Sequence, residues 1–171
     1  ETDSSAGQDQ QVALQEFVSS VVDGESETVR GIYVDNNFEY PVVQQPSNQP
    51  GFVSTQKDVV TEFAMADQYG SIGILAHNFL AGEAFFSLKS NDVIQVVYGD
   101  GTVESYQVTE VLEYQALSPK SASSSFKAVD SGEMLTSTQL FKKVYTGERH
   151  LTLQTCIQVG SEDSWGRLFV I

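Results

Sequence analysis

The sequence is poor in positive charge and in cysteine. Its 171 residues include 9 Lys and Arg against 23 Asp and Glu, which gives a formal net charge of −14 at pH 7. A nucleic-acid-binding face needs clustered basic side chains to neutralise phosphate, so this charge argues against DNA or RNA as a partner. The one cysteine, Cys156, excludes an internal disulfide and a cysteine-rich zinc site.

Long apolar runs are also missing. No stretch approaches the roughly 20 apolar residues that a helix needs to cross a bilayer. The hydrophobic content of 40% is nevertheless ordinary for a globular protein, and the length suits one domain. We therefore expect a single globular domain with a real core.

Short strands dominate the pattern after residue 28. Alternation and turn residues such as Gly99-Asp100-Gly101 predict strands at 29–34, 38–43, 72–76, 93–98, 102–114, 151–156 and 165–171. Short helices are expected at 55–66 and 136–145, and residues 118–125 are a serine-rich loop. Many short strands with few helices predict a mainly β fold, closed or nearly closed into a barrel.

The N-terminal region differs from this pattern. Residues 1–10 are polar and are expected to be a disordered tail. Apolar residues then recur at helical spacing, which predicts a helical appendage over 11–27. Such a helix either covers a functional groove or packs elsewhere on the main domain, and we favour the second. The main domain is expected to span 28–171.

Three segments carry the residues with the most distinctive chemistry. Cys156 ends the run Leu151-Thr152-Leu153-Gln154-Thr155-Cys156, and His77 follows the apolar run Ile72-Gly73-Ile74-Leu75-Ala76. A lone cysteine with a distant histidine is the outline of a thiol nucleophile and its partner. An imidazolium and a guanidinium, here that of Arg167, would both favour the reactive thiolate. The alternative for Cys156 is a small buried apolar residue.

In this order and at these distances, the three segments resemble the sortases, bacterial cysteine transpeptidases that join proteins to cell-wall or pilus acceptors. Residues 152–156 are similar to the family's TLxTC signature, with Gln154 at the variable position. Arg167 lies eleven residues further on, and Ala76-His77-Asn78 is similar to the segment that holds the catalytic histidine. The resemblance covers roughly residues 28–171 and indicates no particular sortase class.

The resemblance implies a closed eight-stranded barrel and a role for each residue. Cys156 would be the nucleophile, His77 the general acid, and Arg167 the group that binds the substrate backbone and stabilises the oxyanion. Thr155 could also bind substrate, or be an ordinary strand residue, and Trp165 could flank the substrate or pack on the barrel. The second histidine, His150, ranks below His77 because the family motif places the catalytic histidine on an earlier strand.

The resemblance also implies partners and a location. The expected substrates are the sorting-signal peptide of a surface protein and an amine acceptor in the cell wall or a pilin, and we expect a monomer. The protein would be extracytoplasmic, either secreted or held at the cell surface by an N-terminal segment outside the present sequence. Two alternatives stay open: a thiol peptidase that passes the acyl group to water, and a non-catalytic peptide-binding module.

No cofactor or metal is expected. Some sortases are activated by calcium, which needs several oxygen ligands converging on one point. The acidic residues at matching places do not form a calcium pattern, and a solvated acidic face explains them better: Asp58, Glu62, Asp67, Asp130 and Glu133.

Overall fold

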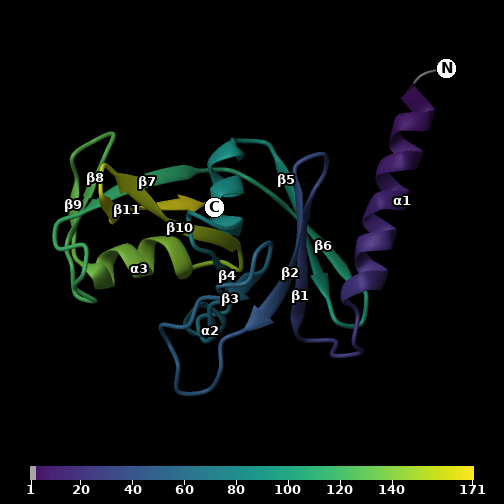
Figure 1. Ribbon diagram of the computed structural model, residues 1–171, viewed down its shortest axis with the longest axis horizontal. Helices are drawn as coiled ribbons and strands as arrows, with labels where there is room; N and C mark the ends of the chain where they lie inside the picture. The colour runs from purple at the N-terminus through teal and green to yellow at the C-terminus, as the bar shows by residue number, and fades with distance from the viewer. Residues whose placement is uncertain (1–2) are drawn as a thin grey trace.

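The computed structural model describes residues 3–171, and within them eleven strands form one sheet (Figure 1). The strands are β1 (Val29–Val34), β2 (Phe38–Gln44), β3 (Val60–Glu62), β4 (Ile72–Leu75), β5 (Val93–Tyr98), β6 (Val103–Gln107), β7 (Val111–Ala116), β8 (Phe126–Ala128), β9 (Met134–Leu135), β10 (Leu151–Val159) and β11 (Glu162–Val170). The helices are α1 (Asp3–Val21), α2 (Ala64–Asp67), α3 (Ser137–Tyr145) and the 3₁₀ helix η1 (Ala81–Ser87).

The sheet is open, with the order β6-β5-β1-β2-β3-β4-β10-β11-β7-β8-β9. The pairs β2–β3 and β4–β10 are parallel, and the other pairs are antiparallel. Across residues 3–171, β6 pairs only with β5 and β9 only with β8, so the sheet does not close on itself. The predicted closed, eight-stranded barrel is therefore wrong in closure and in strand number, whereas a mainly β fold with few helices is confirmed.

The additional strands lie in segments that show little alternation of apolar and polar residues. Strands β8 and β9 have three and two residues, too few for a recognisable pattern, and they extend the sheet beyond β7. The predicted strand over 102–114 is two strands. The backbone N–H groups of Thr109 and Glu110 bond to the carbonyl of Ile171, and this contact turns the chain from β6 into β7.

Residues 60–62 form β3, which lies between β2 and β4, instead of the helix predicted over 55–66. The β-branched run Val59-Val60-Thr61 favours an extended backbone. Only the four-residue helix α2 follows it. The short strand matters for the site because it supports β4 from the side away from β10.

The sheet has a core on each face, because successive residues of a strand point to opposite sides. The larger core lies among β1, β2, β4, β5, β10 and β11 and includes the fully buried Ile32, Ile74, Val96, Leu153 and Leu168. The smaller core lies between α3 and the strands β7, β8 and β11, with Tyr114, Val144, Tyr145 and Phe169. On β11, Leu168 and Phe169 therefore belong to different cores.

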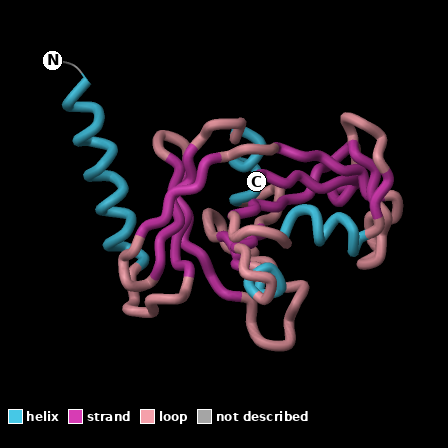
Figure 2. Tube along the Cα trace, turned by 180° about the vertical axis from the view of Figure 1, so that it is seen from behind, coloured by secondary structure: helices cyan, strands magenta, loops and turns pink. Residues whose placement is uncertain are grey.

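Helix α1 packs on the sheet at the side remote from α3 (Figures 1 and 2). Its buried residue Phe17 contacts Tyr33 and Val97, and a Cβ on Gly31 would stand 2.7 Å from the Phe17 ring. The helix begins at Asp3, so residues 3–10 are helical where the sequence predicted a disordered tail. Residues 1–2 of that predicted tail lie outside the described residues.

None of the helices within residues 3–171 combines the length and the apolar character that a membrane crossing requires.

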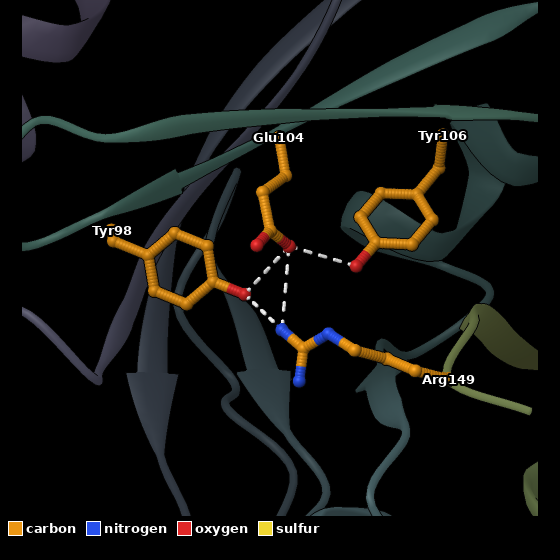
Figure 3. Close-up of polar contacts among 4 residues, drawn as sticks. All are labelled: Tyr98, Glu104, Tyr106 and Arg149. Carbon is orange, nitrogen blue, oxygen red and sulfur yellow. Dashed lines mark hydrogen bonds and ion pairs between the residues drawn. The ribbon is translucent and has the colours of Figure 1, made fainter.

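A polar cluster joins the β5–β6 hairpin to the segment that enters β10 (Figure 3). One carboxylate oxygen of Glu104 accepts hydrogen bonds from the hydroxyls of Tyr98 (3.0 Å) and Tyr106 (2.8 Å). The Arg149 guanidinium lies 3.3 Å from the same oxygen and also donates to Tyr98. Side chains therefore connect β6, at the end of the sheet, to a strand in its middle. Partial burial favours the neutral acid, but the donated hydrogen bonds outweigh it and lower the pKa of Glu104.

We expect Glu104→Gln to lower the free energy of unfolding by about 1 kcal/mol at neutral pH, because both charged groups are partly exposed. The pKa of Glu104 is lower in the folded than in the unfolded state, so its carboxylate stabilises the fold at pH values above the unfolded-state pKa, near 4.5. The difference between wild type and variant should therefore shrink as the pH falls below that value. Urea unfolding at neutral and acidic pH measures it, and a pH-independent difference would contradict this account.

Candidate active site

The strands β4, β10 and β11 lie side by side; β10 holds Cys156, β11 holds Arg167, and His77 follows the end of β4. Cys156 and Arg167 are direct partners in the antiparallel pair β10–β11, so their Cβ atoms are about 5 Å apart. The parallel pairing of β4 with β10 ends at Leu75 opposite Gln154. One more bond, from the Ala76 N–H to the Gln154 carbonyl, continues it. His77 thus leaves the sheet beside the level of Cys156.

Alternation places Cys156 and Arg167 on one face of the sheet. Residues of all three segments mark the face of the larger core, namely Ala76, Leu153 and Leu168. Positions an odd number of residues away face the opposite side. Cys156 and Arg167 are such positions, and His77 follows the last paired residues of the adjacent strand; all three side chains are half-buried. The fold therefore brings the thiol and the guanidinium to one face, and the residue that carries the imidazole to the end of the neighbouring strand.

The backbone of His77 is held by the turn that follows it. Its carbonyl accepts hydrogen bonds from the N–H groups of Leu80 and Gly82, both at 3.0 Å. Its ring stacks on Phe79, with ring centroids 5.1 Å apart and planes tilted by 22°. Phe79 is 64% exposed, so an aromatic ring shields one face of the imidazole while the site stays open to solvent.

Gly82 permits the close approach of this turn to β10. A Cβ at this position would stand 2.8 Å from the His77 carbonyl oxygen and would also overlap the Thr155 side chain. We expect Gly82→Ala to cost about 1–3 kcal/mol in the free energy of unfolding and to move His77. Denaturant unfolding measures the cost. The matched control is Gly7→Ala on α1, where a Cβ meets no atom within 4 Å; equal costs for the two variants would contradict the contact argument.

Arg167 is oriented by its own strand. Its Nη1 donates to the backbone carbonyls of Ser164 (3.0 Å) and Gly166 (2.8 Å). These carbonyls use only one of the guanidinium nitrogens, whereas the group has five N–H donors in a fixed plane. The remaining donors can therefore serve a bound carbonyl or oxyanion.

The two residues predicted to bind substrate lie in different places. Thr155 is 2% exposed, and its hydroxyl donates to the Ala76 carbonyl at 2.8 Å. This position does not agree with substrate binding: the side chain instead ties β10 to the end of β4. Trp165 is half-buried and, two residues before Arg167 on β11, shares its face.

His150 directly precedes the first residue of β10, whereas Cys156 lies beyond the middle of that strand. Its ring nitrogens contact the backbone carbonyls of Glu148 (2.6 Å) and Val144 (2.8 Å). The Val144 carbonyl also accepts a bond from the Thr152 hydroxyl. These contacts anchor the end of α3, and six residues of extended chain, roughly 20 Å, separate His150 from Cys156.

A groove of about 150 Å³ lies beside the site, between α3 and the exposed face of β10 and β11. Its lining is mostly apolar and aromatic, from Phe63, Phe126, Ser137, Leu140, Phe141, Val144, Tyr145, Gln154, Arg167 and Phe169. No sequence motif marks this groove. The apolar stripe of the helix predicted over 136–145 was its only signal, because a stripe does not reveal which strands it faces.

The described part of the chain holds no group of three or more His, Cys, Asp or Glu side chains arranged to bind a metal ion.

The fold is similar to that of several sortases of known structure. Sortase C-1 from Actinomyces oris matches with a TM-score of 0.53 at 12% identity, over 95% of this chain and 94% of that one. Sortase A from Corynebacterium diphtheriae matches with a TM-score of 0.53 at 12% identity, over 95% and 81%. The lid mutant of Streptococcus agalactiae sortase C1 matches with a TM-score of 0.51 at 15% identity, over 94% and 81%.

At these identities, the matches establish that the chain has the sortase fold. The predicted resemblance is confirmed at that level, and both A-type and C-type sortases match, so no class is indicated. No family model matches the sequence, and no curated protein matches it either.

Proposed function

We propose that this protein is a sortase-type cysteine transpeptidase, which cleaves a sorting-signal peptide and transfers the acyl part to an amine. The observation that supports it most is the strand register. In a sortase fold, that register places Cys156 opposite Arg167 and beside the exit of His77. None of the three side chains belongs to the larger core, where a purely structural cysteine would be expected.

In the first half-reaction, the Cys156 thiolate attacks the carbonyl carbon of the scissile amide. The oxygen of the tetrahedral intermediate carries the negative charge, and the spare Arg167 donors stabilise it. The carbon–nitrogen bond then breaks, and the His77 imidazolium gives its proton to the departing amine. Arginine keeps its proton at any physiological pH, so it cannot act as the base.

In the second half-reaction, an acceptor amine attacks the thioester carbonyl, and neutral His77 takes the proton that the amine loses. The carbon–sulfur bond breaks, Cys156 leaves as the thiolate, and a new amide bond forms. The net reaction exchanges one amine for another. If water attacks instead, the product is a carboxylic acid and the protein is a thiol peptidase.

The partners and the location follow from this proposal. The aromatic groove beside Cys156 fits the side chains of a short peptide in extended form. The acceptor would be an amine of the cell wall or of a pilin, so the protein would act outside the cytoplasm. Sortases C-1 and A are the kinds of protein that share this fold.

The test is incubation with a library of sorting-motif peptides, with and without an amine such as triglycine, followed by mass spectrometry. A transpeptidase gives a peptide–amine conjugate that depends on the acceptor, whereas a peptidase gives only the acid. A non-catalytic binding module gives neither product. In that case, Cys156 should also react with iodoacetamide only after denaturation, whereas an active site is alkylated rapidly in a pH-dependent way.

A further inference from the structure

The lining of the groove beside Cys156 includes the amide side chain of Gln154, which a buried tyrosine holds in place. Gln154 precedes Cys156 by two residues, so both face the groove side of β10, roughly 7 Å apart along the strand. The carbonyl oxygen of its amide accepts a hydrogen bond from the Tyr145 hydroxyl.

Tyr145 is placed rigidly by its surroundings. Its side chain is 2% exposed in the smaller core, between the rings of Phe63 and Phe169. Strand β4 leaves room for it at Gly73, where a Cβ would stand 2.9 Å from a ring carbon of Tyr145. The helix that carries it is fixed at its start by a capping box and at its end by the bonds to the Val144 carbonyl.

The direction of the Tyr145–Gln154 bond follows from burial. Burial raises the pKa of the Tyr145 phenol, so the group stays protonated and needs an acceptor. The amide oxygen of Gln154 is that acceptor, which leaves the amide nitrogen with its two N–H donors on the other side of the group. No acceptor within residues 3–171 takes these donors, and the side chain lines the groove.

We infer that Gln154 is a further substrate-binding residue, whose amide N–H groups donate to a backbone carbonyl of the bound peptide, and that Tyr145 is the positioning residue that orients it. This inference rests on the proposed function in taking a peptide as the ligand. The 7 Å offset places that carbonyl about two peptide residues from the bond that Cys156 attacks. The side chain next to it would be apolar, because Phe141 and Phe169 line the same part of the groove.

A disulfide-exchange experiment tests the inference without any catalytic turnover. The probe is a disulfide of cysteamine N-acylated with acetyl-phenylalanine, whose short linker holds a carbonyl at about 7 Å from the Cys156 sulfur, matching the strand offset. The reference probe has an alkene in place of the cysteamine amide and therefore lacks that carbonyl. Intact-mass spectrometry measures the fraction of protein labelled by each probe at a fixed concentration of mercaptoethanol. The fraction labelled by the carbonyl probe, divided by the fraction labelled by the reference probe, is the carbonyl preference.

We expect the wild-type protein to prefer the carbonyl probe about three- to tenfold, the range for one net hydrogen bond. Gln154→Met keeps the shape without donors, and Gln154→Glu keeps the acceptor for Tyr145; both should bring the ratio to one. Tyr145→Phe alone should lower the ratio, and the double variant Tyr145→Phe/Gln154→Met should give the same ratio as Gln154→Met. Tyr114→Phe, which removes a hydroxyl from another buried tyrosine of the same core, should leave it unchanged.

Unfolded molecules react equally with both probes and would bring the ratio toward one, so circular dichroism under the labelling conditions must first show that each variant is folded. A wild-type ratio of one, or a ratio that Gln154→Glu leaves unchanged, would overturn the inference even if the peptide library is cleaved. A carbonyl preference that depends on Gln154, in a protein that cleaves no peptide, would support the inference as a binding property and count against the proposed transpeptidase.

Discussion

Cys156→Ala is expected to lower peptide cleavage by at least about 10⁴-fold, to the background of the measurement. The sulfur is the only thiol in the sequence, so no second cysteine can replace it. The side chain is half-buried and outside the larger core, so its loss should change the thermal midpoint little. Steady-state cleavage and thermal unfolding measured on the same preparation check both expectations.

A control separates the nucleophile from a general effect on the groove. Peptide binding by Cys156→Ala should persist, since the lining of the groove does not include Cys156. A peptidyl vinyl sulfone should modify the wild type once and leave the variant unmodified. Covalent modification of Cys156→Ala, or cleavage near the wild-type rate, would show that the nucleophile has been assigned to the wrong residue.

Arg167→Lys is expected to lose about 100- to 1,000-fold in turnover, the usual effect of removing one oxyanion donor. Lysine keeps the charge but not the planar set of donors that can bond to the strand carbonyls and to an oxyanion together. The loss should appear in kcat more than in KM, because the oxyanion exists only in the transition state.

The two histidines supply the comparison for that result. His77→Ala should also abolish turnover, because it removes the imidazole assigned to protonate the departing amine. His150→Ala should keep near-wild-type turnover per folded molecule, since its ring holds the end of α3 at the far end of β10. An inactive His150→Ala together with a fully active Arg167→Lys would show that both roles were assigned to the wrong residues.

The candidate catalytic residues could be selected from the sequence because their order along the chain is distinctive. The spacing of Cys156 and Arg167 suits two strands joined by a tight turn, and the structure pairs them directly. The parallel pairing of β4 with β10 could not be derived in this way. It joins segments about 79 residues apart, as the Thr155–Ala76 bond shows, and only the resemblance suggested that they meet.

Other features depend on tertiary contacts that leave no local pattern. The number of strands could not be predicted because strands such as β9 have two residues and no alternation to detect. The position of Thr155 before the nucleophile suggests a substrate contact, but alternation along β10 turns its side chain inward, where it bonds to the Ala76 carbonyl. The groove could not be predicted because it forms where α3 packs on β10. That packing depends on single contacts such as the hydrogen bond between Tyr145 and Gln154.

The most direct test of the central claim is the mass of the protein during reaction. Wild-type protein, incubated with a cleaved library peptide and no amine, should gain the mass of the acyl fragment minus one hydrogen, on the tryptic peptide that contains Cys156. Triglycine should remove this adduct and release the peptide–triglycine conjugate. Conversion of the peptide with no adduct on Cys156, or an adduct on another residue, would contradict the proposed thioester pathway.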